Sequence, residues 1–298
     1  MMVRTRNSCR LLSTIVLVVF VCTACAGGGD EVAPVLRFSG IPDQNTTELA
    51  ARFGPLADYL SRVLGVTVEY LPTRDYQATV ETFRNGDILL GWFGGLTGVQ
   101  ARAAVDGSRA IAQGDIDPEY YSYFIANERA GFSASDEFPA EIGEYRFTFG
   151  SESSTSGRLM PEYFIRESTG QSPEEFFAYP IGFSGSHDRT AELVESGQYD
   201  VGVLNYLVYE RRVEDGTIDP QVAEIIWQTP TFVDYHWVAH PRLDETFGEG
   251  FTERLQQTLV GITDSNLLAA LPRDRLIPAD DQDYDQLRAV AEQLGMLR

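Results

Sequence analysis

The stretch Phe147-Thr148-Phe149-Gly150-Ser151-Glu152-Ser153-Ser154-Thr155-Ser156-Gly157 decides how we interpret this chain. A short apolar run leads into a turn with four consecutive hydroxyl residues, and an amphipathic run over 158–167 follows. A strand, a turn and a helix in this order place backbone N–H groups and hydroxyl donors at the positive end of a helix dipole. One serine is enough for an ordinary helix N-cap. The pattern therefore fits either a cap or a site for a small anion.

Strand-like and helical segments alternate on both sides of this turn. We expect strands over 35–40, 67–71, 88–92, 120–126, 147–149, 176–183, 201–204 and 233–239. We expect helices over 49–64, 76–84, 96–104, 158–167, 186–196, 206–214, 247–262 and 284–297, and a surface loop over the acidic stretch 133–144. This alternation is typical of α/β folds with parallel sheets, which bind ligands at the carboxyl ends of their strands.

Two related lobes are indicated by a weak internal echo. The pattern of helix, glycine turn and strand over 79–91 recurs over 190–202. The last strand and helices suggest that the chain returns to its first half. We therefore expect lobe 1 over 34–128 plus 232–298 and lobe 2 over 129–231. Two crossovers, near 127–131 and 229–232, would form a hinge beside a ligand cleft.

The N-terminus reads as a targeting segment. Three arginines precede the apolar run 11–21, and the junction Thr23-Ala24-Cys25 resembles a lipoprotein signal. We expect a signal peptide over 1–24, a lipid on Cys25 and a tether over 25–33. Plain secretory cleavage stays open because Cys22 stands where leucine is usual. All three cysteines lie in this segment, so the mature chain has no disulfide.

The charge limits the partners. The net charge is −21, the signal carries three arginines and no acid, and the mature chain is therefore near −24 (−21 − 3). Nucleic acid and anionic membrane surfaces are disfavoured as partners. The chain contains no lysine. An anion site on such a chain depends on short-range donors, because the long-range field repels anions.

Enzyme and metal chemistry find little support. The run Gly182-Phe183-Ser184-Gly185-Ser186 lacks the final glycine of a nucleophile elbow. His187 is followed directly by Asp188, an arrangement that does not suit a catalytic triad. His236 and His240 flank a strand-like run, where they would stand about 13 Å apart. We expect no catalytic residues, no metal site and no cofactor.

Five motifs in order carry a family resemblance: Arg74-Asp75-Tyr76, Gly91-Trp92-Phe93-Gly94-Gly95, Tyr121-Ser122-Tyr123-Phe124, Ser153-Ser154-Thr155-Ser156-Gly157 and Ser184-Gly185-Ser186-His187-Asp188. Their order and spacing resemble the phosphate/phosphite/phosphonate class of ABC-importer substrate-binding proteins across essentially the whole mature chain. The resemblance implies an α/β fold of the two-lobed periplasmic-binding-protein type (type II), with two hinge crossovers.

The resemblance also implies site residues. Ser154, Thr155 and Ser156 would donate hydroxyls to an oxyanion, and Tyr76 and Tyr121 would donate phenols. His187 would be a further donor, and Asn205 and Asp234 fall near acceptor positions. Trp92 and Phe93 would form the wall of the cleft. Blander roles remain open for some of these side chains. Tyr76 and His187 could be helix caps, and Asp234 could pair with an arginine.

The implied protein is a monomeric, non-enzymatic lipoprotein outside the cytoplasm. It would bind a phosphonate, phosphite or phosphate-like oxyanion and deliver it to an ABC permease and ATPase. Because Asn205 departs from the acidic residue of some relatives, sulfate or selenate stays open as the ligand. The sequence is also compatible with a sensor subunit that uses the same cleft, and less so with a secreted hydrolase.

Overall fold

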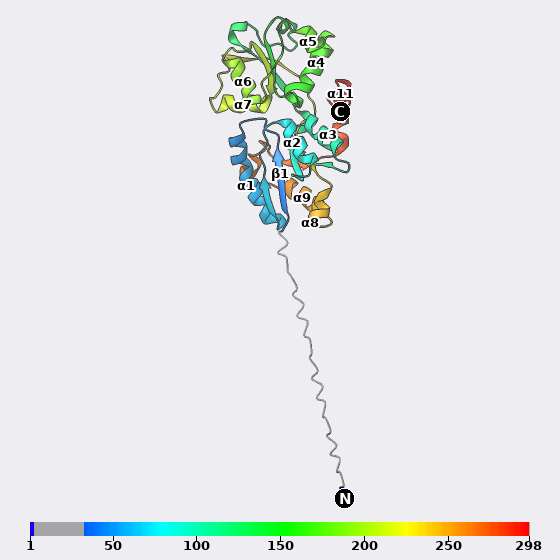
Figure 1. The fold of residues 1–298 in the computed structure, drawn as a ribbon. Coiled ribbons are helices and arrows are strands. Elements are labelled where there is room, and N and C mark those ends of the chain that lie inside the picture. Colours follow the sequence, from blue (N-terminus) through cyan, green and yellow to red (C-terminus); the bar gives the residue numbers. More distant parts are fainter. Residues whose placement is uncertain (3–32, 298) are drawn as a thin grey trace. The chain divides into compact units, whose positions relative to one another are not determined.

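Two β-sheets organise the chain in a computed structural model that describes residues 1–2 and 33–297 (Figure 1). The first sheet has six strands in the order β11-β4-β10-β3-β1-β2. Their bounds are β1 Val35–Gly40, β2 Thr67–Tyr70, β3 Leu90–Phe93, β4 Arg109–Gly114, β10 His236–Ala239 and β11 Leu276–Pro278. β1 is parallel to β2 and β3, whereas β10 lies antiparallel between β3 and β4. The chain therefore returns to its first sheet late in the sequence, as we expected.

The second sheet has five strands in the order β7-β6-β8-β5-β9. Their bounds are β5 Ser122–Asn127, β6 Phe147–Phe149, β7 Gly182–Phe183, β8 Val201–Asn205 and β9 Ala223–Gln228. β6 is parallel to β7 and β8, and β5 is antiparallel to β8 and β9. The hydroxyl-rich turn thus begins at the carboxyl end of a central strand of this sheet.

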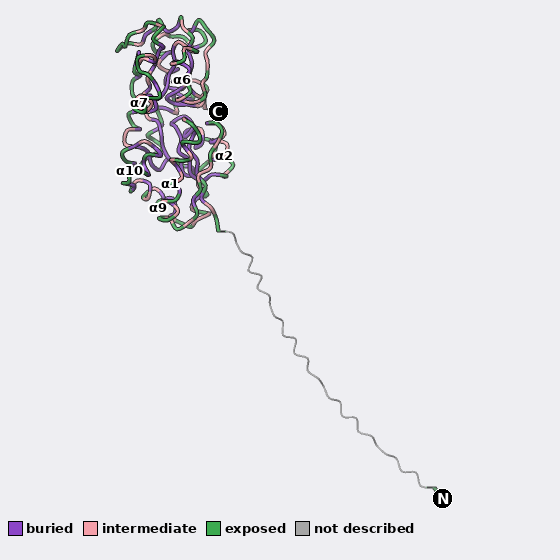
Figure 2. Tube along the Cα trace, turned by 90° about the vertical axis from the view of Figure 1, so that its left-hand side faces the viewer, coloured by how far each residue is buried: buried purple, intermediate pink, exposed green. Residues whose placement is uncertain are grey.

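Helices surround both sheets (Figure 1). Those that follow strands of the first sheet are α1 Thr46–Leu64, α2 Tyr76–Arg84, α3 Gly95–Ala104, α8 Arg242–Phe247, α9 Phe251–Val260, α10 Ser265–Leu268 and α11 Asp285–Gln293. Those that follow strands of the second sheet are α4 Met160–Thr169, α5 Pro173–Phe176, α6 His187–Glu195 and α7 Tyr206–Glu214. Buried segments run through the interior of both groups (Figure 2). α1 shows the local logic: Asn45 accepts the N–H groups of Thr47 and Glu48 as its N-cap, and its apolar positions face the core.

We call residues 34–119 plus 233–297 lobe 1 and residues 120–232 lobe 2, following sheet membership. The chain passes between them twice, and the two passages pair with each other. Tyr120 and Phe232 form a β-bridge, with each N–H donating to the other's carbonyl at 2.8 Å. The N–H of Asp234 also donates to the carbonyl of Asp117 at 3.0 Å. The two crossover segments are therefore hydrogen-bonded to each other.

The expected boundary of lobe 1 at residue 128 placed the strand that follows Tyr121 in the wrong sheet. β5 pairs with β8 and β9, so it belongs to the second sheet. The tyrosine-rich composition of this strand predicts a strand but does not say which sheet it joins, because pairing depends on contacts distant in sequence. The expected signal peptide, Cys25 and the tether lie outside the described residues, apart from positions 1, 2 and 33.

Other sequence expectations were wrong in detail. The strand predicted over 176–183 is only Gly182–Phe183, because Ser172 and Glu175 form a capping box that starts the short helix α5 before it. The acidic stretch is not wholly a surface loop, since Ile142 is buried. β4, β9 and β11 were not predicted. Among the described residues no helix is both long and apolar enough to cross a membrane.

A buried ion pair lies behind the crossovers. Arg273 donates from Nε to Oδ2 of Asp117 at 2.9 Å, and both side chains are almost fully buried. Asp117 also accepts the N–H of Gly114 at 2.7 Å. The guanidinium lies over the rings of Trp92, Tyr120 and Tyr235. Removing one member of such a pair leaves an uncompensated buried charge, which is strongly destabilising.

We predict that Asp117→Asn lowers the free energy of unfolding by about 3 kcal/mol, because Arg273 then stays buried without a counter-charge. Urea denaturation measures the change. Asp115→Asn is the matched control, since the Asp115–Arg275 pair is 3.5 Å long and its arginine is exposed. That control should cost less than about 1 kcal/mol. Equal losses in both variants would contradict a structural role for the buried pair.

Candidate functional site

The hydroxyl-rich turn is partly self-contained. The N–H of Gly150 donates to the carbonyl of Gly157 at 2.8 Å, and Ser154 Oγ accepts the N–H of Gly157 at 2.9 Å. Ser154 is therefore a real N-cap. It starts one π-helical turn, Thr155–Leu159, which runs into α4. Such turns are frequent at functional sites. Thr155 and Ser156 are buried but do not cap this helix, so their hydroxyls can serve another role.

The first turn of α3 joins the two lobes. The N–H of Leu96 donates to Thr155 Oγ1 at 2.9 Å, and the N–H of Gly95 donates to Asp234 Oδ1 at 2.9 Å. A Cβ at Gly94 would lie 3.2 Å from each of these side-chain oxygens, so the close approach favours glycine there. One helix end thus holds a hydroxyl from lobe 2 and a carboxyl from the second crossover.

The Asp234 carboxyl is fully buried, and only one of its two oxygens has a hydrogen-bond partner in the described chain. Oδ1 has its bond from Gly95, whereas Oδ2 has no hydrogen-bond partner among the described residues. Burial raises the pKa of Asp234 from 3.8 to about 7, against the lowering effect of the Gly95 N–H and of the nearby Thr155 and Ser156 hydroxyls. No arginine of the described chain pairs with Asp234, so pairing with an arginine is not its role there. Near neutral pH the carboxyl can either accept or donate a proton.

His187 is set up as a neutral donor. It is the first residue of α6, and its N–H donates to the carbonyl of Asp43 at 3.0 Å. Its Nδ1 accepts the N–H of Asn205 at 3.3 Å. Burial lowers the pKa of His187 to about 4, so the ring is neutral at pH 7 and carries its proton on Nε2. That Nε2 is buried and has no partner in the described chain.

Tyr76 supplies a second unpaired donor. It begins α2, but Asp75 caps that helix by accepting the N–H of Ala78 at 2.7 Å, so Tyr76 is not the cap. Its phenol is buried and has no hydrogen-bond partner within residues 33–297. Burial raises the pKa of Tyr76 well above 10, while the nearby Ser154 hydroxyl lowers it. The phenol therefore stays protonated and can donate.

These side chains converge. A Cβ on Gly157 would lie 2.9 Å from Ser154 Oγ and 3.2 Å from a ring carbon of His187. We call the set Tyr76, Ser154, Thr155, Ser156, His187 and Asp234 the anion cluster. It combines neutral O–H and N–H donors with one carboxyl and includes no arginine. Leaving a buried polar group unpaired costs about 1–3 kcal/mol. Three such groups in one cluster indicate a site built to be completed by a polar ligand.

Three other predicted residues are placed differently. Asn205 accepts the N–H of Val208 at 2.8 Å and donates to Tyr235 Oη at 3.2 Å, so both polar atoms of its amide are already engaged. Tyr121 is half-buried and stacks on Tyr206 with ring centroids 3.9 Å apart. Phe93 is core, fully buried against Phe83, whereas Trp92 does line a cavity. These contacts do not support the roles predicted for Asn205, Tyr121 and Phe93, which stay predictions.

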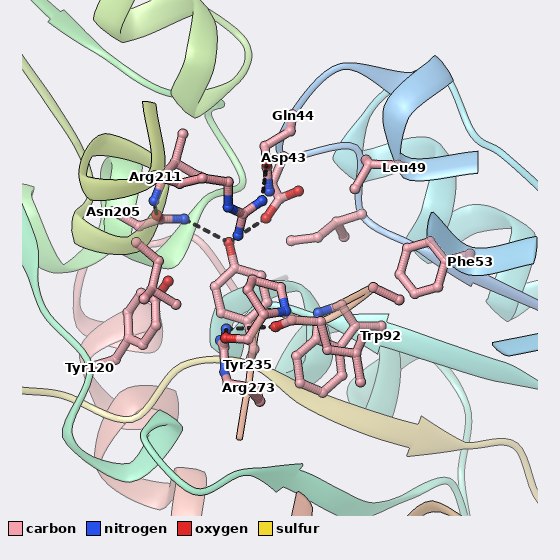
Figure 3. A pocket seen from close by; sticks show the side chains of 16 residues that line it. Asp43, Gln44, Leu49, Phe53, Trp92, Tyr120, Asn205, Arg211, Tyr235 and Arg273 are labelled. Atoms are coloured by element: carbon pink, nitrogen blue, oxygen red, sulfur yellow. Dashed lines mark hydrogen bonds between the residues drawn. The ribbon is translucent and has the colours of Figure 1, made fainter. Parts of the chain in front are cut away.

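Sequence reasoning missed a second polar group, shown in Figure 3. Asp43, Gln44, Arg211 and Tyr235 line a cavity of about 20 Å³ together with Trp92, Asn205, Arg273 and apolar side chains of both lobes. That volume holds about one water molecule. Asp43 follows the carboxyl end of β1, and this position alone was a signal that we did not use.

The geometry does not support hydrolase or metal chemistry among the described residues. Ser184 Oγ contacts the carbonyl of Ser186 at 2.9 Å and the hydroxyl of Thr190 at 2.6 Å, neither of which is a general base. His236 lies in β10, in the strand conformation that we expected. Within residues 33–297 no three acidic, histidine or cysteine side chains gather in a way that could hold a metal ion.

Two α/β lobes joined by paired crossovers, with unpaired buried groups between them, define a periplasmic-binding-protein fold. Similarity to known proteins agrees with this fold and identifies the class of binding protein. The family model described as "ABC transporter, phosphonate, periplasmic substrate-binding protein" matches residues 38–284. The chain belongs to this family. It is therefore an extracytoplasmic substrate-binding component of an ABC transport system and not an enzyme.

Individual relatives cover nearly the whole chain. The chain is 40% identical to the "Probable ABC transporter phosphite binding protein PhnD1" of Prochlorococcus marinus, over 89% of this chain and 91% of that protein. A structure of PhnD1 with methylphosphonate matches with a TM-score of 0.84 and 41% identity, covering 88% of this chain and 98% of that one. The "Phosphate-import protein PhnD" of Mycolicibacterium smegmatis is 23% identical, over 93% of this chain and 94% of that protein. The expected family and fold are confirmed.

We predict that Asp234→Asn flattens the pH dependence of stability in the ligand-free protein. The folded pKa of about 7 lies above the ordinary 3.8, so folding favours the protonated form. Stability is therefore lost as the pH rises from about 4 to about 7, by at most about 4 kcal/mol for this group. Asparagine keeps an acceptor for Gly95 and carries no charge. Urea unfolding at about pH 5 and about pH 8 measures the difference.

Asp200→Asn is the control for this measurement. Hydrogen bonds from Arg146 lower the pKa of Asp200, so its contribution is already complete at about pH 5. This variant should lose stability equally at both pH values and keep the wild-type slope. An Asp234→Asn protein with an unchanged slope would show that Asp234 is ionised in the fold throughout this range.

Proposed function

We propose that this protein binds a small tetrahedral oxyanion of the phosphonate, phosphite or phosphate kind in the anion cluster. It then delivers the anion to the permease and ATPase of an ABC importer. The observation that carries the proposal is the set of three buried polar atoms without partners in the described chain: Tyr76 Oη, His187 Nε2 and Asp234 Oδ2. Tyr76 and Asp234 belong to lobe 1, Asp234 beside the second crossover, and His187 belongs to lobe 2, so one ligand between the lobes would complete all three.

The chemistry of the cluster suits an oxyanion that shares a proton. The phenol, the imidazole N–H and the hydroxyls of the turn can donate to three oxygens. Asp234 Oδ2 meets the ligand as an acceptor when ionised and as a donor when protonated. The second ionisation of phosphite, phosphonate and phosphate lies near neutrality, close to the pKa of about 7 of Asp234. Ligand and carboxyl together therefore hold one proton in the complex.

Relatives support this ligand class. The Prochlorococcus marinus protein is named for phosphite and its structure contains methylphosphonate. The Mycolicibacterium smegmatis protein is named for phosphate. Sulfate and selenate stay open as ligands, but the reason differs from the one that the sequence suggested. The Asn205 amide is engaged by Tyr235 and Val208, but a protonated Asp234 offers these anions a donor.

The remaining parts of the proposal concern the cell surface. We propose that Cys25 carries a lipid and that this anchor is the protein's only membrane contact. We further propose that the protein is a monomer that presents its closed form to the permease. The lipoprotein-like junction Thr23-Ala24-Cys25 supports the first of these statements. A role as a sensor subunit would use the same site.

Calorimetry with phosphite, methylphosphonate, phosphate, sulfate and selenate at several pH values tests the function. We expect affinity for the first three to peak near pH 7, because the complex takes up a proton above that pH and releases one below it. Affinity for sulfate and selenate should fall steadily as Asp234 ionises. The preference for phosphonates should grow about tenfold between about pH 6 and about pH 8. Absence of binding to every anion at low salt would refute the proposal.

Replacing both Thr155 and Ser156 with alanine should weaken methylphosphonate binding by about 2–4 kcal/mol, since each hydroxyl donor contributes about 1–2 kcal/mol. Titration calorimetry measures this loss. Ser153→Ala is the matched control, because Ser153 lies in the same turn but is only half-buried and outside the cluster. Its affinity should stay within about twofold of wild type, since it loses no donor to the ligand. A double variant with undiminished affinity would move the site elsewhere in the cleft.

A further inference from the structure

A second set of contacts joins the lobes beside the anion cluster, around the cavity in Figure 3. In the first contact, Asn205 of lobe 2 donates from Nδ2 to Tyr235 Oη at 3.2 Å, and Tyr235 donates to Asp43 Oδ2 at 2.8 Å. In the second, Arg211 of lobe 2 donates from Nη1 to Gln44 Oε1 at 3.1 Å. We call these five residues the latch. They share no member with the anion cluster.

The first contact has a fixed direction of donation. A phenol has one proton, and Tyr235 gives it to Asp43, which lies just past the end of β1. The phenol oxygen can then only accept, so its partner across the lobes must be a donor. The Asn205 amide meets this need while its Oδ1 caps α7 through the Val208 N–H. All three side chains are buried, so a wrong donor–acceptor match would not be repaired by water.

The second contact also joins the two lobes, and its acceptor is a single side-chain carbonyl. Gln44 Oε1 accepts from Arg211 on α7 of lobe 2 and from Arg52 Nη1 on α1 of lobe 1, at 3.1 and 3.2 Å. The Arg52 bond stays within lobe 1, so only the Arg211 bond is lost when the lobes separate. These two arginines share an acceptor, but only the Arg211 bond spans the lobes. Arg52 is therefore a matched control for Arg211.

We propose that Asn205 and Arg211 set the affinity for every anion through the closed state, without touching the anion. This inference rests on the proposed function of the cluster. The latch bonds exist only when the lobes are closed, so they raise the closed fraction before and after binding. Apparent affinity scales with the fraction of molecules in the binding-competent state. A change in that fraction multiplies the affinity for all ligands by one factor and leaves their ratios unchanged.

Two variants with one control test the latch. Arg211→Met removes the bond to Gln44. Asn205→Ser keeps a capping residue for α7 and adds no charge, but its short side chain does not reach Tyr235. Each variant should weaken binding of methylphosphonate, phosphite, phosphate and sulfate by one factor that is the same for all four anions, up to about tenfold for the loss of one hydrogen bond. Ligand-free small-angle scattering should show a larger radius of gyration. Arg52→Met should change neither affinity nor radius.

The outcomes separate a latch from a ligand contact. If Asn205→Ser changes the ratio of phosphonate to sulfate affinity, Asn205 contacts the ligand and the latch is refuted. If Arg211→Met leaves the affinities and the ligand-free radius at wild-type values, the bonds between the lobes do not control closure. Thermal unfolding of each variant verifies that it is folded. Failure of the wild type to bind any anion would refute the proposed function instead, and the ligand-free radius would still report on the latch.

Discussion

The first turn of α3 donates two neighbouring N–H groups, one to Asp234 and one to Thr155, and the rest of the site depends on this pair of bonds. Asp234 belongs to the crossover and Thr155 to lobe 2, whereas the helix belongs to lobe 1. A helix N-terminus usually offers its free N–H groups to an anion directly. Here they hold the protein's own oxygens in place, and those oxygens and their neighbours make up the anion cluster.

Binding an anion on a chain with net charge −21 requires that the local chemistry overcome the long-range field. In the proposed site this role falls to the anion cluster, which contains no cationic side chain. Burial acts in opposite directions on its titratable groups: it keeps His187 neutral with a proton on Nε2, and it raises the pKa of Asp234 to about 7. A neutral imidazole and a carboxyl poised to share a proton add little net charge to the site. The ligand's own charge is then matched by dipoles, whose fixed orientation selects the tetrahedral geometry.

Sequence predicted the parts of this site that depend on local pattern. The hydroxyl-rich turn could be recognised because it lies at a strand-to-helix junction. Tyr76 and His187 could be assigned because their short motifs resemble those of the family. The sheet of β5, the position of β10 between β3 and β4, and the contact of Asn205 with Tyr235 could not be predicted, because each depends on a partner far away in sequence. Asn205 shows this most clearly. Its position at the end of β8 suggested a ligand contact, but its side chain turns to Tyr235, 30 residues away.

The separation of the anion cluster from the latch has a physical consequence for how such a protein can change. Groups that touch the ligand decide which oxyanion fits and where its proton lies. Groups that only join the lobes change the closed fraction and therefore all affinities together. In this chain Tyr235 is the latch residue that is next to the anion cluster in sequence. Its backbone follows Asp234 directly, and its phenol receives the Asn205 amide. Movement of the second crossover on ligand binding would therefore reach the latch through Tyr235. His187 is a second link, because its N–H donates to Asp43 and its Nδ1 accepts from Asn205. Both links couple selection of the anion to closure of the lobes.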